Sequence, residues 1–340
     1  MRPLQLIRIF CLALAISTSV TMPASAQSTA ENSNFSLRVA VGGISMLFLN
    51  YFWALDNGYF QDAGVNVTSI MAKNGPMASQ AVVSGEADVG TDNLARVFKL
   101  RSKDADVVAF AVFNVGIEQT LVLSTELMKS LPPNPSVDEA VKAMRGRKIA
   151  VSGPGTAQDL ILRHLLRSRG LNPDQYLHLI NLASSPALYI ESIRNKVIDG
   201  LMTTEPIISE VVNSGAGKVV FTTLRDMPPA ARLPYQVAFA SGPVVATKKE
   251  ALAAFSRALG RASAALKAAG YEGSKPILKK YWPMFGEESL RAGFEQMNWP
   301  LSPSLDKATA QMAADWNFKA GLVDKPVSPA ELDKSFVVIP

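Results

Sequence analysis

The feature that most constrains the fold of this chain is a short strand that ends in a glycine-rich turn and leads into a helix. The apolar residues 149–151 read as a buried strand, the sequence SGPGT at 152–156 forms a sharp turn, and residues 157–169 carry apolar side chains at helical spacing. The first turn of a helix presents unpaired N–H groups and the positive end of the helix dipole. The turn therefore suits an anionic or polar ligand group, with the alternative that Thr156 serves only as the helix N-cap.

The same pattern occurs 110 positions earlier, where the strand VAV at 39–41 is followed by the turn GGIS. The correspondence continues along the chain, because Pro76 matches Pro186 at the same spacing and Asp88 matches Asp199 at a spacing of 111. An internal duplication of this kind predicts two similar α/β lobes, each with a strand whose loop faces a shared cleft. The alternative is that any two βαβ units look alike at this level.

The N-terminus has the three parts of a secretory signal peptide. Arg2 and Arg8 precede an apolar segment at 9–20, which ends in the small-residue sequence PASA, so cleavage is expected after Ala26. The apolar segment is too short for an ordinary membrane span. Cys11, the only cysteine, lies inside it, and the mature chain is therefore expected to lack disulfides and thiol ligands. We expect the mature protein in the periplasm.

Composition is that of a globular protein with two lobes or domains. Hydrophobic residues make up 48% and charged residues 19% of the chain, and no later apolar run is long enough to cross a membrane. The formal net charge of +5 falls to +3 without Arg2 and Arg8. These charges are dispersed and form no basic run interleaved with aromatic residues, so no nucleic-acid partner is expected. The mild positive charge favours a small anionic ligand.

Polar residues follow two predicted strands at their carboxyl ends, where open α/β sheets bind ligands. The sequence TDN at 91–93 follows a strand predicted to end at Gly90, and TTE at 203–205 follows another. Capping of the next helix is the favoured role for Asp92, with ligand contact as the alternative. For Glu205 both roles stay open, since a carboxylate also favours a helix N-terminus.

The remaining pattern predicts helices at both ends of the chain. A helix over 47–60 is rich in aromatic residues, most of which belong in the core, although Met46, Phe48 and Tyr51 are near enough to the first turn to face a ligand. Residues 244–247 are predicted to be extended, and residues 249–269 begin a helical C-terminal part. This part is predicted to pack onto the first lobe.

Five stretches along the chain match sequence motifs of a known family. They are ALDNGYF at 54–60 with Gly64, VSGEADVG at 83–90, RGRKIAV at 145–151 continuing to Gly155-Thr156, VIDG at 197–200 followed by Glu205-Pro206, and GLV at 321–323 with KPV at 325–327. In this order they resemble the nitrate/sulfonate/taurine-type substrate-binding proteins of ABC transporters. That group also includes binders of thiamine pyrimidine precursors and of some aromatic acids.

The resemblance implies a type 2 periplasmic binding fold, in which two α/β lobes are joined by two crossovers with the ligand cleft between them. After the signal peptide at 1–26 and a lead at 27–36, lobe 1 would comprise residues 37–120 and 240–340, and lobe 2 residues 121–239. The resemblance implies no cofactor, no metal and no catalytic residue. We expect a monomer that delivers a small-molecule ligand to an ABC permease and its ATPase at the membrane.

The resemblance also implies which loops bind the ligand. The residues are Gly43, Ser45, Met46, Asn74, Gly75, Thr91, Asp92, Asn93, Asn114, Gly155, Thr156, Gln158, Thr203 and Glu205. Two departures from the family leave the ligand open. Many relatives have an aromatic residue just before Glu-Pro, where this chain has Thr203-Thr204, and the cysteine-rich segment of one thiamine-precursor branch is missing.

We therefore expect the extracytoplasmic solute-binding component of an ABC import system, which captures a small organic anion by closure of its lobes. The anion would be a sulfonate or carboxylate, with an aromatic body as one option. Because Asp92 and Glu205 suit an amino or hydroxyl group, a zwitterion or a neutral heterocycle stays open. The alternatives are a ligand sensor without transport and a secreted enzyme. His164 and His178 do not suggest a shared metal site, and the sequence has no HExxH, G-x-S-x-G or full Walker A motif.

Overall fold

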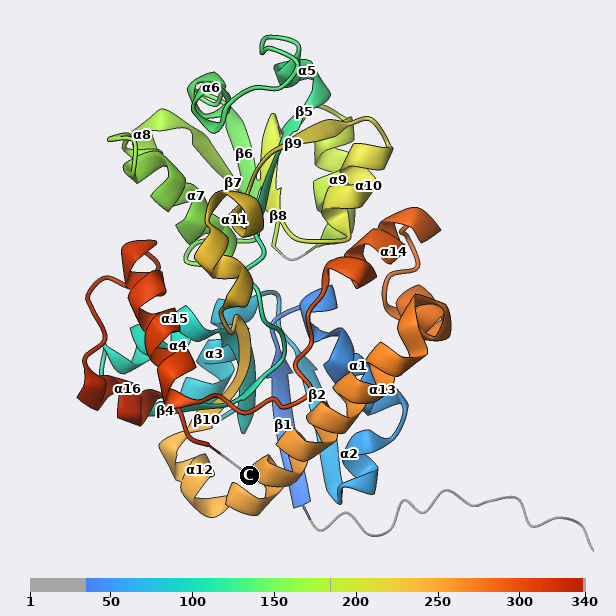
Figure 1. Cartoon of the computed structure of the whole chain (residues 1–340), viewed down its shortest axis with the longest axis vertical. Coiled ribbons are helices and arrows are strands. Elements are labelled where there is room, and N and C mark those ends of the chain that lie inside the picture. The colour runs from blue at the N-terminus through green and yellow to red at the C-terminus, as the bar shows by residue number, and fades with distance from the viewer. Residues whose placement is uncertain (1–34, 184, 339–340) are drawn as a thin grey trace, which may run out of the picture. The chain divides into compact units, whose positions relative to one another are not determined.

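The computed structural model describes residues 35–183 and 185–338, all within the compact unit Ser33–Pro340 (Figure 1). The predicted signal peptide and most of the lead lie outside the described residues. The strands of the described part form two five-stranded mixed sheets, each with helices packed around it. The predicted two-lobed α/β fold is confirmed. We call the part built on the sheet that contains β1 the first lobe and the other part the second lobe.

The sheet of the first lobe has the order β2-β1-β3-β10-β4, in which β10 is antiparallel to both of its neighbours. Its strands are β1 (Phe35–Val41), β2 (Val65–Met71), β3 (Val89–Asn93), β4 (Val107–Val112) and β10 (Gln236–Ser241). Its helices are η1 (Met46–Phe48), α1 (Leu49–Asp56), α2 (Tyr59–Asp62), α3 (Gly75–Val83), α4 (Leu94–Arg101), α12 (Gly242–Thr247), α13 (Lys249–Tyr281), α15 (Lys307–Lys319) and α16 (Pro329–Ser335).

The sheet of the second lobe has the order β7-β6-β8-β5-β9, in which β5 is antiparallel to both of its neighbours. Its strands are β5 (Thr120–Ser124), β6 (Lys148–Val151), β7 (His178–Asn181), β8 (Gly200–Thr203) and β9 (Gly217–Thr222). Its helices are α5 (Thr125–Met128), α6 (Val137–Ala143), α7 (Ala157–Arg167), α8 (Pro173–Tyr176), α9 (Pro186–Arg194), α10 (Ile207–Asn213) and α11 (Thr223–Asp226).

The two sheets repeat the same arrangement, as the sequence duplication predicts. When β6, β7 and β8 are matched to β1, β2 and β3, the antiparallel strand β5 takes the place of β10. The matched aspartates have the same role. Asp88 accepts a hydrogen bond from the backbone N–H of Arg38 at 2.9 Å, and Asp199 accepts one from the backbone N–H of Lys148 at 2.9 Å. Pro76 and Pro186 both lie in the first turn of a helix, α3 or α9.

Two paired crossovers join the lobes. Residues 113–119 run from β4 to β5, and residues 223–235 run back from β9 to β10. A bridge between Val115 and Pro234 and a backbone hydrogen bond of 2.8 Å from Gly116 to Leu233 tie the two segments together. The strand pairing assigns all of β10 to the first sheet, whereas the predicted lobe boundary falls within this strand. The exact division of the chain into lobes stays a prediction.

The C-terminal part packs onto the first lobe, as predicted, and also reaches the second. Phe255 of α13 stacks on Phe60 of α2 with ring centres 4.7 Å apart, and α13 extends to Tyr281 after a break at Gly270, where φ is 61°. The next helix, α14 (Glu287–Gln296), contacts α10 of the second lobe (Figure 1). There Ser289 donates to Glu210 at 3.0 Å. This second contact is not apparent from the sequence pattern.

Three predicted elements differ from the structure. Residues 244–247 are helical in α12 rather than extended, because Pro243 in the first turn favours a helix, while the two valines that follow it suggested a strand. The helix predicted over 47–60 is divided into η1, α1 and α2, and α1 is separated from α2 because Gly58 adopts a left-handed φ of 76°. Strand β3 continues to Asn93 and thus includes the whole TDN sequence. No helix among the described residues is long and apolar enough to cross a membrane.

Candidate functional site

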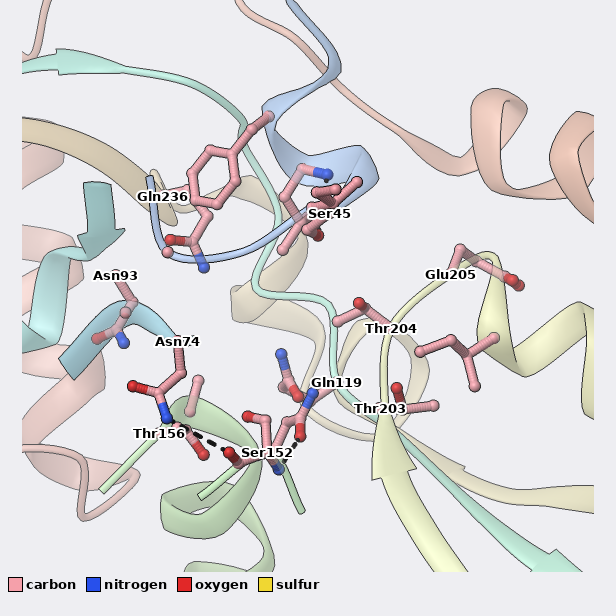
Figure 2. Close-up of a pocket in the computed structure, with 18 of the residues that line it drawn as sticks. Ser45, Asn74, Asn93, Gln119, Ser152, Thr156, Thr203, Thr204, Glu205 and Gln236 are labelled. Atoms are coloured by element: carbon pink, nitrogen blue, oxygen red, sulfur yellow. Dashed lines mark hydrogen bonds between the residues drawn. The ribbon is translucent and has the colours of Figure 1, made fainter. Parts of the chain in front are cut away.

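A cavity at the carboxyl ends of the parallel strands of both sheets is the candidate ligand site (Figure 2). Its volume is about 100 Å³, and it is partly open to solvent. Ligand sites of open α/β sheets favour this edge. Its walls come from both lobes, so one molecule in the cavity would contact both.

Nine of the predicted ligand-binding residues line this cavity, and five do not. Those that line it are Ser45, Asn74, Gly75, Asp92, Asn93, Thr156, Gln158, Thr203 and Glu205. Gly43, Met46, Thr91, Asn114 and Gly155 are not among the lining residues. The structure thus brings together residues that lie far apart in the sequence. Their part in ligand binding stays a prediction.

The residues outside the lining support its loops or belong to the core. Thr91 accepts a hydrogen bond from the backbone N–H of Gly42 at 2.9 Å, which ties β3 to the first turn. Gly43, in the same turn, has a φ of 107°. Met46 is buried, and its sulfur lies so close to Gly293 of α14 that a Cβ at that glycine would be 2.6 Å away.

Asn114 and Gly155 also have structural contacts. Asn114 links the crossovers, because its amide donates to the carbonyl of Gly116 at 3.2 Å and accepts from the N–H of Gln236 at 3.2 Å. The carbonyl of Gly155 accepts a hydrogen bond from the guanidinium of Arg96 in the other lobe. These contacts position the loops without requiring a ligand.

Several polar residues of the lining cap the helices that begin at the cavity. Asn74 accepts a hydrogen bond from Met77 of α3 at 3.1 Å, Asn93 accepts one from Arg96 of α4 at 2.9 Å, and Thr156 accepts one from Asp159 of α7 at 3.4 Å. The capping role considered for Thr156 is therefore confirmed. These caps satisfy N–H groups of the first helical turns and fix where each helix begins.

Asp92 does not have the capping role that the sequence favours, because Asn93 is the N-cap of α4. Its buried carboxylate accepts from Ser79 at 2.9 Å and from the side chain of Asn93 at 2.8 Å, and it lies 3.4 Å from the guanidinium of Arg96. Burial raises the pKa of Asp92, although Arg96 and the hydrogen-bond donors favour the ionised form. Protein groups thus already supply much of the hydrogen bonding and charge compensation that this carboxylate needs.

Glu205 lies at the N-terminus of α10, where it accepts hydrogen bonds from the backbone N–H and hydroxyl of Ser209 at 3.0 and 2.9 Å. Figure 2 shows its side chain extending away from the middle of the cavity. The sequence left two roles open for Glu205, and the structure shows the contact with the N-terminus of α10. Burial raises the pKa of Glu205, although the Ser209 donors favour the ionised form.

Glu118, on the first crossover, lies behind Glu205. It is buried and accepts the backbone N–H of Glu205 at 2.9 Å, while its second oxygen has no partner in the structure. Burial, together with the charge of Glu205, raises the pKa of Glu118 to about 8, although the N–H of Glu205 favours the ionised form. Of these two carboxyl groups, only that of Glu205 belongs to the lining of the cavity.

The crossovers also bring residues into the lining that the sequence analysis missed. Gln119 ends the first crossover, Tyr235 ends the second and Gln236 begins β10. The Gln119 side chain donates to the Tyr235 hydroxyl at 2.7 Å. No local motif marks these residues, because only the pairing of the crossovers brings them to the cavity.

Aromatic side chains give the cavity apolar walls. Phe48 packs edge-on against Phe113 with ring centres 5.2 Å apart, and Trp282 lines the cavity from the end of α13. Tyr189 of α9 donates to the side chain of Gln158 at 2.9 Å, and burial raises the pKa of its hydroxyl. These walls suit the organic body of a small molecule. None of the lining residues, all of which the structure describes, is a lysine or an arginine.

Comparison with known proteins identifies a family and a sequence relative of this chain. The sequence profile of the NMT1-like family matches residues 36–273. A nitrate/nitrite binding protein, NrtA, of Nostoc sp. (strain PCC 7120 / SAG 25.82 / UTEX 2576) is 24% identical over 181 residues, which are 50% of this chain and 41% of that protein. The match therefore spans less than half the length of that relative.

Solved structures match nearly the whole of the described fold. A protein from Bordetella bronchiseptica RB50 has a TM-score of 0.78 at 22% identity, over 89% of this chain and 94% of that one. The alkanesulfonate-binding protein SsuA from Xanthomonas axonopodis pv. citri, bound to MOPS, has a TM-score of 0.65 at 14% identity, over 85% and 94%. The structural matches include the periplasmic binding protein fold. Its relatives and structural neighbours include nitrate- and alkanesulfonate-binding proteins. Since the family profile extends from β1 into α13, the chain belongs to the NMT1-like family.

Proposed function

We propose that this protein is the extracytoplasmic solute-binding component of an ABC import system and captures a small polar organic solute. The observation that supports this most is a cavity lined by both lobes, whose connection consists of two paired crossovers. A solute in that cavity contacts both lobes only when they are close together. Binding then shifts the population towards the closed form, which a membrane partner can recognise.

The solute we propose is neutral or carries a basic group, which differs from the organic anion expected from the sequence. Helix N-termini at the cavity and the ligands named for the relatives, nitrate and alkanesulfonate, favour an anion. The side chains favour the opposite. The lining contains Asp92 and Glu205 but no lysine or arginine, and Arg96 nearby already pairs with Asp92. A buried anion without a positive partner is strongly disfavoured.

The proposal is tested by a thermal-shift screen of mature protein that has been unfolded, washed and refolded to remove bound solute. Ligands that bind only the folded state stabilise it by RT ln(1 + [L]/Kd), about 2.7 kcal/mol at 100 times Kd. That corresponds to a rise of several degrees in Tm. The panel contains amines, carboxamides, amino-heterocycles, carboxylates, sulfonates and nitrate.

Two results complete this test. A solute that raises Tm should also stimulate ATP hydrolysis by the cognate permease–ATPase complex in the presence of this protein, and it should remain chemically unchanged after long incubation. Turnover of the solute would contradict the proposal and favour an enzyme. Binding without stimulation would favour a sensor. If no class of solute changes Tm although the refolded protein is native, solute capture in this cavity is ruled out for these classes.

A further inference from the structure

We propose that Gln119 and Thr203 form a hydrogen-bond-acceptor subsite that selects solutes with an N–H donor group, such as an amide, an amine or an amidine. The inference rests on the proposed function, since it assigns the chemistry of the same cavity. Neither its acceptor atoms nor its preference follows from the motifs of the sequence. Gln119 is also absent from the residues that the sequence predicts to bind ligand.

The subsite is identified by buried polar atoms that lack a partner. Six buried side-chain nitrogen or oxygen atoms of the described residues have no hydrogen bond. Only two of these belong to residues that line the cavity: Oε1 of Gln119, which is 1% exposed, and Oγ1 of Thr203, which is 0% exposed. An unsatisfied buried polar group costs about 1–3 kcal/mol, so such atoms are rare and each needs an explanation. A solute in the cavity would supply the missing partner.

The two residues lie beside each other in the second lobe. In the antiparallel ladder of β5 and β8, Thr120 is opposite Thr203, so Gln119 is the next residue along from that pair. Figure 2 shows Gln119, Thr203 and Thr204 on the same side of the cavity. We place both acceptors in one subsite because their residues are adjacent in the ladder and line the same cavity.

The Gln119 amide contacts the end of the second crossover. Its nitrogen donates to the hydroxyl of Tyr235 at 2.7 Å, and in this arrangement its oxygen is the unpaired atom. Its backbone is held between the crossovers, since its N–H donates to Thr223 Oγ1 at 2.9 Å. An amide oxygen only accepts hydrogen bonds, and a threonine hydroxyl can accept as well as donate. The pair therefore favours a donor on the solute.

The surroundings strengthen this preference. Glu118 precedes Gln119 and Glu205 lies two residues after Thr203, and neither has a lysine or arginine among its hydrogen-bond or ion-pair partners in the described structure. The N–H of Glu205, which could have bound an anion at the start of α10, is already donated to Glu118 at 2.9 Å. An anionic head group here would lie near the carboxyl group of Glu205 with no lysine or arginine in the lining to offset its charge, whereas a head group with an N–H donor carries no negative charge.

The test uses four probes that share one ring and differ only in the head group: benzamide, benzamidine, benzoate and benzenesulfonate. Binding to the refolded mature protein is measured by thermal shift and by titration calorimetry. We expect benzamide and benzamidine to bind and the two anions to bind at least tenfold more weakly. Thr203→Val and Gln119→Met should each weaken benzamide and benzamidine binding by about 3- to 10-fold. Each variant removes one hydrogen-bond acceptor from the subsite, and the fold-change corresponds to the net contribution of one hydrogen bond.

Thr120→Val is the matched control. Thr120 is buried on the neighbouring strand, opposite Thr203, but does not line the cavity, so its valine variant should bind the probes within twofold of the unaltered protein. A second measurement needs no ligand at all. Because Oγ1 of Thr203 has no partner to lose, Thr203→Val should leave the Tm of the ligand-free protein unchanged or raise it.

The outcomes separate this inference from the proposed function. If benzoate or benzenesulfonate binds as tightly as the N–H probes, or if both variants bind like the Thr120→Val control, the subsite is overturned while solute capture stands. A large loss of Tm in ligand-free Thr203→Val overturns it as well, because the hydroxyl would then have a structural partner. If none of the four probes nor any solute of the wider panel binds, both proposals fail.

Discussion

Arg96 in α4 of the first lobe donates a guanidinium hydrogen bond to the carbonyl of Gly155, in the glycine-rich turn of the second lobe. The same guanidinium lies 3.4 Å from the buried carboxylate of Asp92, at the edge of the cavity. A second contact between the lobes is the long hydrogen bond of 3.5 Å from Asn74 to the carbonyl of Ser152. The residue that holds the two loops together is therefore also the partner of a cavity carboxylate.

Arg96→Met should destabilise the ligand-free protein by about 2–4 kcal/mol, because it leaves the charge of Asp92 buried without its partner. The measurement is urea unfolding at neutral pH. Lys99→Met is the control, since Lys99 lies on the same helix but pairs with the exposed Asp324, and exposed ion pairs contribute at most about 1 kcal/mol. Equal losses in the two variants would show that the Asp92 contact contributes no more than a surface pair.

Thr156→Ala should lower the free energy of unfolding by about 1 kcal/mol, since it removes the N-cap of α7. Ser136→Ala, which removes the N-cap of α6 away from the cavity, should cost a similar amount. Comparison of the two variants therefore separates the effect of helix capping from that of ligand contact. A weaker affinity for a bound solute in Thr156→Ala alone would indicate a ligand contact, and equal affinity in both variants would restrict Thr156 to capping.

Glu118→Gln should change how stability depends on pH. A carboxyl whose pKa is about 8 in the folded protein and near 4.3 in the unfolded chain binds more protons when folded. Its contribution to stability is therefore complete below about pH 4.3 and declines as the pH rises towards 8. The glutamine keeps an oxygen for the N–H of Glu205 and cannot ionise.

Urea unfolding of both proteins between pH 5 and 9 measures this effect. Relative to the unaltered protein, Glu118→Gln should gain stability with rising pH, by on the order of 4 kcal/mol in total. Parallel pH profiles would contradict a raised pKa of Glu118 in the folded protein.

Asp88→Asn should have the opposite dependence on pH. Although burial acts to raise the pKa of Asp88, hydrogen bonds from Arg38 and the nearby Lys248 lower it below its usual value. The stabilisation is therefore present above about pH 3.9 and is lost as the pH falls through the folded pKa. We expect a loss of about 1–2 kcal/mol at pH 7 that shrinks towards pH 3.

Asp199→Asn is the matched variant in the second lobe. Asp199 accepts the equivalent backbone hydrogen bond from Lys148, but its nearest ion-pair contact, with Arg147, is 3.9 Å long. The Asp199→Asn variant should therefore lose less stability at pH 7 than the Asp88→Asn variant. A larger loss would show that the backbone contact outweighs the ion pairs at this position of the repeat.

Much of the fold could be predicted because its signals are local. The strand at 149–151 with its glycine turn and the N-cap at Thr156 fall within a few residues of one another, and hydrophobic periodicity marks the helix that follows. The repeat at an offset of 110 predicts the second lobe, because a second copy of the strand–turn–helix unit can begin a second sheet with its own helices. Where prediction failed, at residues 244–247, the β-branched valines and the preceding proline gave opposite local signals.

The two α/β lobes and the glycine turns at their strand ends follow from local sequence patterns, and the family resemblance adds most of the polar residues that line the cavity. Which of those residues are free to meet a solute depends on contacts across the fold. The tertiary structure placed Gln119 and Tyr235 in the cavity through the paired crossovers, engaged Glu205 with Ser209, and paired Asp92 with Arg96. The physical reason is that hydrogen-bond partners and burial depend on residues brought together across the fold, which no local spacing records.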